Sequence, residues 1–416
     1  MSDKTAKICA IDLFCGVGGV TRGLLDAGID VIAGFDIESS AKQAYEENNI
    51  RPNGEKARYI QKSVTELTKK DITDLVGSKT KRKKEKTKFL LAGCAPCQPF
   101  STKNKNRGNK SDPRRTLIVY FADLIQTLEP DFVFMENVAG LEKFEPENFA
   151  YFLEVLSKRN YGVDKKIVNA VNYGVPQNRK RFVLLASKKG EVKIPQGEYD
   201  GVSKSYKTVG DTIKGLAPIE AGEEHPKIPN HKAANLLPIN KQRLQYKNRL
   251  EWPQELWLEC HKRTSGHSDT YGRMDWNRPA PTLTTKFFSV STGRYGHPEQ
   301  YRAISLREGA LLQSFPENYI FFENRTEKVA RQIGNAVPPK MKAMPILGDL
   351  HEELQKNEMT KRIAIIVSRF VTGSAQSFNQ QTNVDLSNKY IVLDLSELKG
   401  KLLPVGMMIA LDYVWD

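Results

Sequence analysis

The stretch from Lys7 to Gly28 constrains the fold of this chain more than any other. Residues Lys7 to Phe14 are mostly apolar and have the length of a buried parallel strand. The glycine-containing segment Cys15 to Gly19 follows, and residues Val20 to Ala27 then predict a helix that ends at Gly28. A strand, a glycine turn and a helix in this order let a cofactor approach the backbone, as in α/β folds.

The glycine turn does not match a dinucleotide-binding fingerprint. That fingerprint needs a third glycine three residues after Gly18, where this chain has Thr21. A dehydrogenase is therefore disfavoured. The next predicted strand, Asp30 to Phe35, ends in Asp36. An acid at this place can accept hydrogen bonds from a ribose diol, although it can also cap the helix that follows.

A second feature is a cysteine held on a stiff turn. The predicted strand Lys88 to Ala92 leads to Cys97, and Pro96 and Pro99 prevent the chain from continuing as helix or central strand. A thiolate placed at the end of a strand is a strong nucleophile. The spacing of Cys94 and Cys97 alone favours instead a structural thiol or a redox pair.

Two further segments place charged side chains at strand ends. Glu136 follows the predicted strand Asp131 to Met135, so its carboxylate is expected at the same crevice as Cys97. Arg179 and Arg181 are two residues apart in a predicted strand, so their side chains point to the same face. Two cations on one face are costly unless an anion or a substrate binds there. The alternatives are a structural acid paired with an arginine, and an edge strand with solvated arginines.

Charge and composition narrow the class of protein. The chain has 416 residues, a formal net charge of +14 and a pI near 9.3, which suggests nucleic acid as a polyanionic partner, although solubility alone also explains such a charge. No apolar run is long enough for a membrane span, and the first residues lack a secretion signal. Five cysteines, an odd number, indicate a reducing compartment. We expect a cytoplasmic protein. We also expect a helix over Ser63 to Val76 and a solvated loop over Lys79 to Lys88.

Six segments in a fixed order resemble the DNA (cytosine-5)-methyltransferase family. They are Asp12 to Gly19, Pro96 to Ser101, Glu136 to Val138, Gln177 to Arg181, Arg278 to Thr282 and Gly334 to Pro339. Together they cover about the first 350 residues. The resemblance implies an α/β fold, in which a doubly wound, Rossmann-like sheet binds S-adenosylmethionine and a smaller target-recognition domain faces a DNA-binding cleft.

The resemblance also divides the chain. The predicted parts are a catalytic cofactor-binding domain over 1–187, a target-recognition domain over 188–277, a return segment over 278–331, a helix completing the catalytic domain over 332–357, and an appended fragment over 358–416.

By position, the resemblance assigns cofactor-binding roles. Phe14 is expected near the adenine, Gly16 and Gly18 allow close approach, and Asp36 holds the ribose hydroxyls with Ile37 beside the adenine. Further cofactor-lining positions are Ser63, Val64, Pro96, Leu117, Asn335 and Val337. The family often has an Asp-Ile pair where Ser63 and Val64 stand here, so that contact departs from the pattern.

The same resemblance assigns catalysis to four residues. Cys97 is expected to add to carbon 6 of cytosine, Glu136 to protonate ring nitrogen 3, and Arg181 to hold the exocyclic oxygen. Arg179 is expected to orient this cluster and to help ionise Cys97.

The predicted partner is duplex DNA, from which the target base is flipped. Predicted DNA contacts are Gln98, Ser101, Thr102 and Arg107, where residues 101–110 are expected to form a lid, with Lys262, Arg263, His267 and Arg273 as further candidates. We expect a monomer that functions beside a separate restriction endonuclease. The alternatives are a transfer-RNA cytosine methyltransferase and a non-catalytic DNA-binding regulator. No metal site is expected, because Cys260, His261 and His267 lack a second cysteine pair.

Residues 358–416 extend beyond the family pattern. About 55 of them resemble an internal piece of conjugative-transfer ATPases of the type IV secretion kind. No G-x-x-x-x-G-K-[S/T] loop occurs in the chain, so ATPase activity is not expected. We interpret the fragment as a passive appendage, with an oligomerisation module as the alternative.

Overall fold

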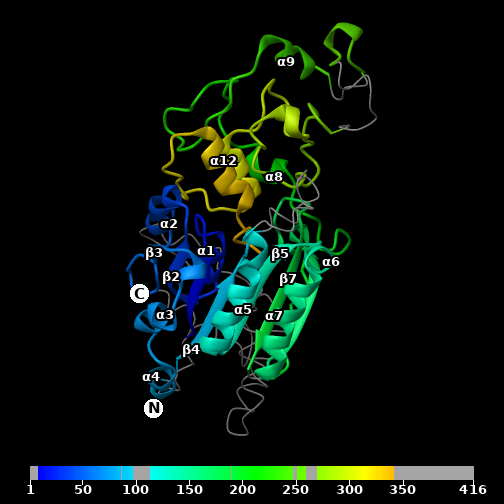
Figure 1. Ribbon diagram of the computed structural model, residues 1–416. Coiled ribbons are helices and arrows are strands. Elements are labelled where there is room, and N and C mark those ends of the chain that lie inside the picture. The colour runs from blue at the N-terminus through cyan, green and yellow to red at the C-terminus, as the bar shows by residue number, and fades with distance from the viewer. Residues whose placement is uncertain are drawn as a thin grey trace, which may run out of the picture. The chain divides into compact units, whose positions relative to one another are not determined.

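A mixed seven-stranded sheet positions the segments singled out above (Figure 1). The structure, a computed structural model, describes residues 8–85, 87–96, 113–188, 190–246, 251–258 and 269–341. These residues fall within one compact unit, residues 1–345. Within the described ranges, no helix has the length and apolar character needed to cross a membrane.

The strands run in the order β3-β2-β1-β4-β5-β7-β6. They are β1 (Ile8–Leu13), β2 (Asp30–Asp36), β3 (Arg58–Gln61), β4 (Lys88–Gly93), β5 (Phe132–Val138), β6 (Gly162–Asn169) and β7 (Lys180–Ser187). Strands β1 to β5 are parallel, and β7 lies antiparallel between β5 and β6. The order reverses between β1 and β4, which is where a doubly wound sheet binds its ligands. The predicted α/β fold with a doubly wound sheet is confirmed.

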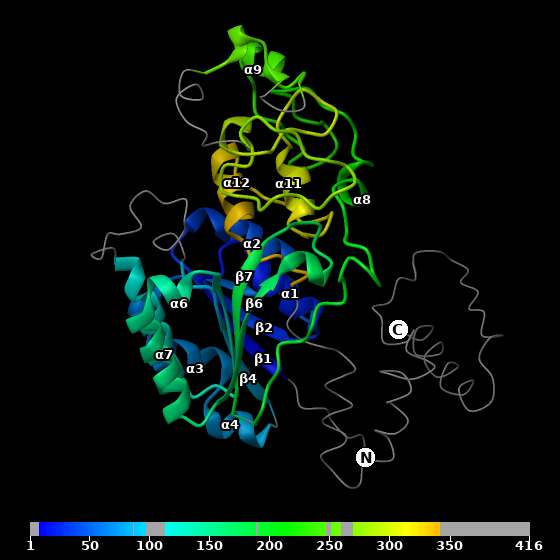
Figure 2. The ribbon, with the colours of Figure 1, turned by 90° about the vertical axis from the view of Figure 1, so that its right-hand side faces the viewer.

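Apolar residues alternate between the two faces of the central strands. In β4, Phe89 and Leu91 join one hydrophobic cluster, whereas Leu90 and Ala92 join another. The first cluster lies under α3 (Lys69–Val76), α5 (Leu117–Leu128) and α7 (Pro146–Lys158). The second lies under α1 (Gly19–Asp26), on the other face (Figure 2). Both faces are therefore covered, as a parallel sheet requires.

Two local predictions need correction. The predicted helix over Ser63 to Val76 is split into a short 3-10 turn, η2 (Val64–Glu66), and α3, because Thr68 and Asp71 form a capping box that starts a new helix. The basic run is not a loop: residues Lys79–Lys84 form helix α4. The Ser78 hydroxyl accepts from the Lys81 amide and caps this helix, so a favourable cap prevails over the repulsion of like charges.

Residues 209–335, as far as they are described, form a small part with little regular structure. Its helices are α8 (Gly210–Ile213), α9 (Pro238–Arg243), α11 (Leu306–Leu312) and α12 (Thr326–Asn335). The hydrophobic cluster around α11 and α12 also contains Ala41, Ala44 and Tyr45, which lie at helix α2 (Lys42–Asn48) beside the sheet. This shared cluster joins the small part to the sheet. The predicted domain boundaries stay a prediction, and residues 342–416 lie outside the described ranges.

Buried ion pairs and hydrogen bonds replace regular structure inside the small part. The Arg302 guanidinium donates to both carboxylate oxygens of Glu308 at 2.7 Å, and both side chains are almost fully buried. Glu308 also completes a capping box with Ser305 at the start of α11. Such pairs fix the relative positions of loops that have few ladder hydrogen bonds.

Candidate active site

An acid and a guanidinium meet where β5 and β7 pair. Glu136, at the end of β5, is 7% exposed. The Arg181 Nε lies 2.9 Å from its Oε1. The antiparallel register pairs Val138 with Arg181, which places Glu136 and Arg181 two residues apart along the ladder and on one face. The structure thus brings together two of the four predicted catalytic residues.

Burial changes the acidity of Glu136. Removal of the carboxyl from water raises its pKa, and the positive charges of Arg181 and Arg179 oppose that rise. Because the pKa is raised, a larger fraction of Glu136 is neutral at the pH of a cell. A carboxyl group in this state can give a proton to a substrate nitrogen.

Arg179 has a different environment from Arg181. Its side chain is 2% exposed. Its Nη1 donates to the Leu283 carbonyl at 3.1 Å, and its Nη2 donates to the carbonyls of Gly334 at 3.1 Å and Ala336 at 3.3 Å. Arg179 therefore ties the start of β7 to two distant segments. These contacts support an orienting role.

Asn137 connects the acid to the segment that leads to Cys97. Its buried amide donates to the Ala95 carbonyl at 3.2 Å. Ala95 lies two residues before Cys97, which itself lies outside the described residues. The segment that leads from β4 to Cys97 is therefore hydrogen-bonded, through Ala95, to the neighbour of Glu136 in β5.

The cysteines that the structure describes are poorly suited to nucleophilic attack at this site. Cys9 and Cys15 are buried, and burial raises the pKa of Cys9 to about 11 and that of Cys15 well above its usual value. Thiols with raised pKa are poor nucleophiles at neutral pH. Cys94 is partly buried and precedes Pro96 by two residues.

The glycine turn after β1 has an unusual backbone. Phe14, Gly16 and Gly18 have φ values of 59°, 49° and 88°, in the left-handed region. Asp36, at the end of β2, accepts from the Gly16 amide at 2.9 Å and from the Glu38 amide at 3.0 Å. The Asp36 carboxylate therefore fixes the glycine turn and the backbone that follows β2. The side chain that caps the next 3-10 helix, η1 (Ser39–Ala41), is that of Glu38, and the contact of Asp36 with a ribose diol stays a prediction.

The chain before Pro338 packs onto this same turn. A Cβ added to Gly19 would collide with the Val337 carbonyl oxygen and contact Ala336. The absence of a side chain at Gly19 therefore lets residues 336 and 337 approach the start of α1. This contact brings the predicted cofactor residue Val337 beside the glycine turn, from more than 300 positions away in the sequence.

The other predicted cofactor residues differ in exposure. Ile37 is 70% exposed, which leaves an apolar surface next to Asp36. Val64 is buried in the sheet cluster, and the Ser63 hydroxyl accepts from the Thr65 amide and caps η2. Leu117 opens α5, Asn335 closes α12 and is exposed, and Pro96 ends the described part of the Cys97 segment.

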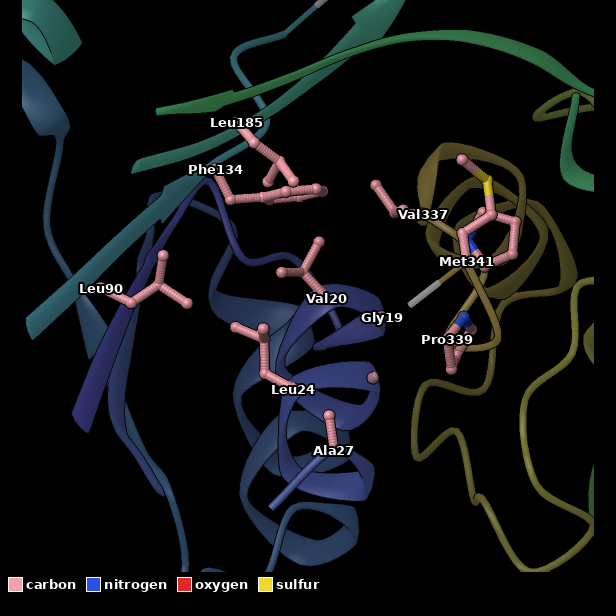
Figure 3. Close-up of a pocket in the computed structure, with 12 residues that line it drawn as sticks. Gly19, Val20, Leu24, Ala27, Leu90, Phe134, Leu185, Val337, Pro339 and Met341 are labelled. Carbon is pink, nitrogen blue, oxygen red and sulfur yellow. The ribbon is translucent and has the colours of Figure 1, made fainter. Parts of the chain in front are cut away.

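An apolar pocket lies on the α1 face, and Gly19 and Val337 are among its lining residues (Figure 3). Its lining includes Val20 and Leu24 of α1, Phe134 and Leu185 of the sheet, and Val337. Its cavity volume is about 30 Å³, which is room enough for water. Its lining carries no charged side chain.

Most of the predicted DNA contacts belong to parts of the chain that the structure does not describe. Gln98, Ser101, Thr102, Arg107, Lys262, Arg263 and His267 lie outside the described residues. Arg273 is described, and its guanidinium donates to the backbone carbonyls of Leu244, Pro298 and Glu299. These bonds indicate a structural role for Arg273 within the small part.

Sequence reasoning assigned no role to a buried polar chain beneath the glycine turn. The Thr21 hydroxyl donates to Asp12 Oδ2 at 2.7 Å and lies 2.9 Å from the Tyr45 hydroxyl. An acid inside the otherwise apolar strand Ile8–Leu13 was the available signal for Asp12. No local signal marks Tyr45 or its neighbours. Among the described residues, no cluster of acids, histidines and cysteines could hold a metal ion.

A family of known proteins matches most of this chain. The C-5 cytosine-specific DNA methylase family matches residues 8–346. The type II methylase M.HgiDII of Herpetosiphon aurantiacus is 42% identical over 340 residues, which cover 79% of this chain and 91% of that protein. The type II methyltransferase M1.BsuMI of Bacillus subtilis (strain 168) is 31% identical over 356 residues, which cover 83% and 81%.

A solved structure shares the fold. A chain described as a DNA modification methyltransferase encoded within a prophage (E. coli) superposes with a TM-score of 0.62 at 23% identity, covering 84% of this chain and all of that one.

Proposed function

This chain belongs to the C-5 cytosine-specific DNA methylase family and is a DNA (cytosine-5)-methyltransferase, and we propose that it methylates a specific duplex site through a covalent bond between Cys97 and a flipped cytosine. Membership in the family implies S-adenosylmethionine as methyl donor and DNA as substrate. The buried pair of Glu136 and Arg181 is the observation that best supports the proposed roles of individual residues.

The chemistry of cytosine explains why a thiolate and an acid are needed together. Carbon 5 is too electron-poor to attack a methyl group. When the Cys97 sulfur bonds to carbon 6, Glu136 gives its proton to ring nitrogen 3, and carbon 5 becomes nucleophilic. Carbon 5 takes the methyl group, and the donor leaves as the neutral thioether S-adenosylhomocysteine. Carbon 5 then gives its proton to water, the sulfur–carbon bond breaks with Cys97 leaving as the thiolate, and the proton on nitrogen 3 returns to Glu136. Arg181 holds the exocyclic oxygen beside Glu136, and both groups act where charge develops.

The residues around the glycine turn fit an adenosine group with a cationic sulfur. Gly16 and Gly18 leave the backbone open to a ligand, Asp36 supplies carboxylate oxygens near the turn, and the exposed Ile37 offers an apolar contact for a base. Phe14, Ser63, Val64, Pro96, Leu117, Asn335 and Val337 are the remaining proposed lining residues. When bound, S-adenosylmethionine supplies an electrophilic methyl group on a positively charged sulfur.

The proposed DNA contacts come from two stretches of the sequence. Gln98, Ser101, Thr102 and Arg107 follow Cys97, and residues 188–277 are proposed to select the sequence. The net charge of +14 favours binding to the phosphate backbone. Relatives are named type II methylases, which supports a role in restriction–modification beside a separate endonuclease. We propose a monomer that functions in the cytoplasm, with residues 358–416 as a passive appendage derived from a conjugative-transfer ATPase.

Transfer of a labelled methyl group to DNA tests the proposal. The full chain should label a duplex library and not transfer RNA, and bisulfite sequencing of DNA from expressing cells should reveal one short recognition sequence. A duplex with 5-fluorocytosine in that sequence should form a denaturant-stable adduct with the protein. Cys97→Ser should abolish both labelling and the adduct while leaving S-adenosylmethionine binding intact. Methylation by Cys97→Ser, or labelling of transfer RNA alone, would refute the proposal.

A further inference from the structure

We propose that Tyr319 is a positioning residue that couples the glycine turn to the small part of the molecule, so that cofactor and DNA influence each other's binding. The inference rests on the proposed cofactor site at the glycine turn and names a link that this site would need. Tyr319 belongs to none of the six segments that carry the family resemblance. It lies in the segment between α11 and α12.

The Tyr319 hydroxyl makes two hydrogen bonds in a buried position. The side chain is 1% exposed. Its hydroxyl donates to the Val17 carbonyl and accepts from the Asn49 side-chain amide at 3.2 Å. Burial raises the pKa of Tyr319, so the hydroxyl keeps its proton for Val17. A residue of the small part thus holds the carbonyl at the centre of the turn.

The turn has little freedom to move away from this contact. Gly18 has a φ of 88°, and a Cβ built on it would come within 2.6 Å of the Asn49 Nδ2 and 3.3 Å of the Tyr319 hydroxyl. The turn therefore rests directly on these polar atoms. A shift of Tyr319 would have to move Val17 and Gly18 or break the hydrogen bond.

The residues around Tyr319 are fixed to both sides of the joint. The Asn48 side chain exchanges two hydrogen bonds with the backbone of Ile320, each at 2.8 Å. The Asn230 side chain exchanges two with the backbone of Phe321, at 2.8 and 2.9 Å. Asn48 ends α2 beside the sheet, and Asn230 belongs to the small part. Tyr319 directly precedes these two anchored residues, so its backbone is held on one side by α2 and on the other by the small part.

The contact between Tyr319 and Val17 links the affinity for the cofactor to the affinity for DNA. If DNA shifts or restrains the small part, the carbonyl of Val17 shifts or is restrained with it, and the affinity of the turn for S-adenosylmethionine changes. The effect is reciprocal, so the cofactor changes the affinity for DNA by the same factor. Replacement of the hydroxyl should weaken both the turn and the coupling.

The test uses the full chain with Tyr319→Phe. The dissociation constant of S-adenosylmethionine should rise about tenfold, because the Val17 carbonyl and the Asn49 amide lose a buried partner. The factor by which a cognate duplex changes that constant should fall towards one. The methylation rate at saturating cofactor should change much less than the KM for cofactor.

Two further variants make the outcome decisive. Tyr161→Phe removes a buried hydroxyl that donates to the Pro130 carbonyl at 2.5 Å, near the start of β6, and should leave cofactor affinity and coupling unchanged. Asn48→Ala releases Ile320 without touching the turn, so it should reduce the coupling while leaving cofactor affinity without DNA unchanged. This second variant also tests the inference if Tyr319→Phe folds poorly.

Two outcomes would overturn the inference. One is an unchanged coupling factor in both Tyr319→Phe and Asn48→Ala. The other is an equal loss in Tyr161→Phe, which would indicate a general effect on stability. Failure of the unaltered chain to bind S-adenosylmethionine would instead contradict the proposed cofactor site, so the two failures are distinguishable.

Discussion

At the scale of single residues, a buried acid beneath the glycine turn has a property that affects the whole fold. Asp12 is 1% exposed, and its Oδ2 accepts from Thr21 at 2.7 Å, whereas its Oδ1 has no hydrogen-bond partner within the described ranges. Burial raises the pKa of Asp12 from 3.8 to about 7, against the opposing effect of Thr21. Ionisation of Asp12 in the folded state is therefore costly.

We expect this acid to make stability depend on pH. The folded pKa is raised, so between about pH 4 and 7 the folded state keeps a proton that the unfolded state has lost, and the free energy of unfolding falls as pH rises through this window. Asp12→Asn should remove that fall. Above pH 7 the variant should exceed the parent by at most about 4 kcal/mol. Denaturant unfolding at several pH values between 5 and 8 measures the difference.

An acid with the opposite shift provides the control. Asp71 is hydrogen-bonded to Lys62 and Thr68, and these bonds lower its pKa to about 2. The Asp71 carboxylate is therefore charged above pH 5 in both the folded and the unfolded chain. Asp71→Asn should leave the slope of stability between pH 5 and 8 unchanged. An Asp12→Asn variant whose slope equals that of the parent would contradict the expectation.

At the scale of elements, the start of β7 combines two arginines with different environments. Arg181 faces the Glu136 carboxylate, whereas Arg179 donates to backbone carbonyls of three other residues. A planar guanidinium presents five donors in a rigid fork, whereas an ammonium presents three donors from one compact charge. The same substitution should therefore have different effects at the two positions.

We expect Arg179→Lys to act mainly on stability and Arg181→Lys mainly on rate. The first leaves buried carbonyls without donors and should lower the free energy of unfolding by about 3 kcal/mol. Arg181→Lys keeps a positive charge near Glu136 but loses the forked donors of the guanidinium. Methylation should therefore slow by at least about tenfold, while the free energy of unfolding changes less. Urea unfolding and methyl-transfer rates, measured on both variants, test this contrast. Equal losses in both quantities at both positions would contradict it.

The elements also show what the sequence could and could not predict. Short apolar runs at β1, β2, β4 and β5 are sufficient to predict parallel strands, because burial on both faces needs continuous apolar residues. The antiparallel insertion of β7 between β5 and β6 depends on long-range pairing. The basic run Lys79–Lys84 predicts a loop because like charges repel, but the Ser78 cap allows helix α4 to form.

The candidate site divides in the same way. Glu136, Arg179, Arg181 and the glycine turn were predictable, since each lies at a strand end with a local pattern. Tyr319 was not, because it reaches Val17 across some 300 residues and its own neighbourhood is an ordinary aromatic cluster with Phe315 and Phe321. Contacts of this kind are determined by packing and leave no periodic signal.

At the scale of the whole chain, the net positive charge is carried by nearly the same residues that match the family. Residues 358–416 contain six basic and six acidic side chains, so the net charge of +14 belongs to residues 1–357. The family match ends at residue 346. Binding to DNA phosphates releases counterions in proportion to the contacts made, so the salt dependence of affinity reports which residues contribute.

A chain that ends at Asn357 should therefore bind DNA as the full chain does. We expect the slope of log affinity against log salt between 50 and 200 mM, as well as the methylation rate, to agree with those of the full chain, because the removed residues add no net charge and lie outside the family match. A matched control replaces Lys83 and Lys84 of α4 with Gln. This helix precedes β4 and lies at the opposite edge of the sheet from the end that leads to Cys97, so the control should also keep the slope. A shallower slope or a slower rate in the shortened chain would show that the appended residues take part in DNA binding or catalysis.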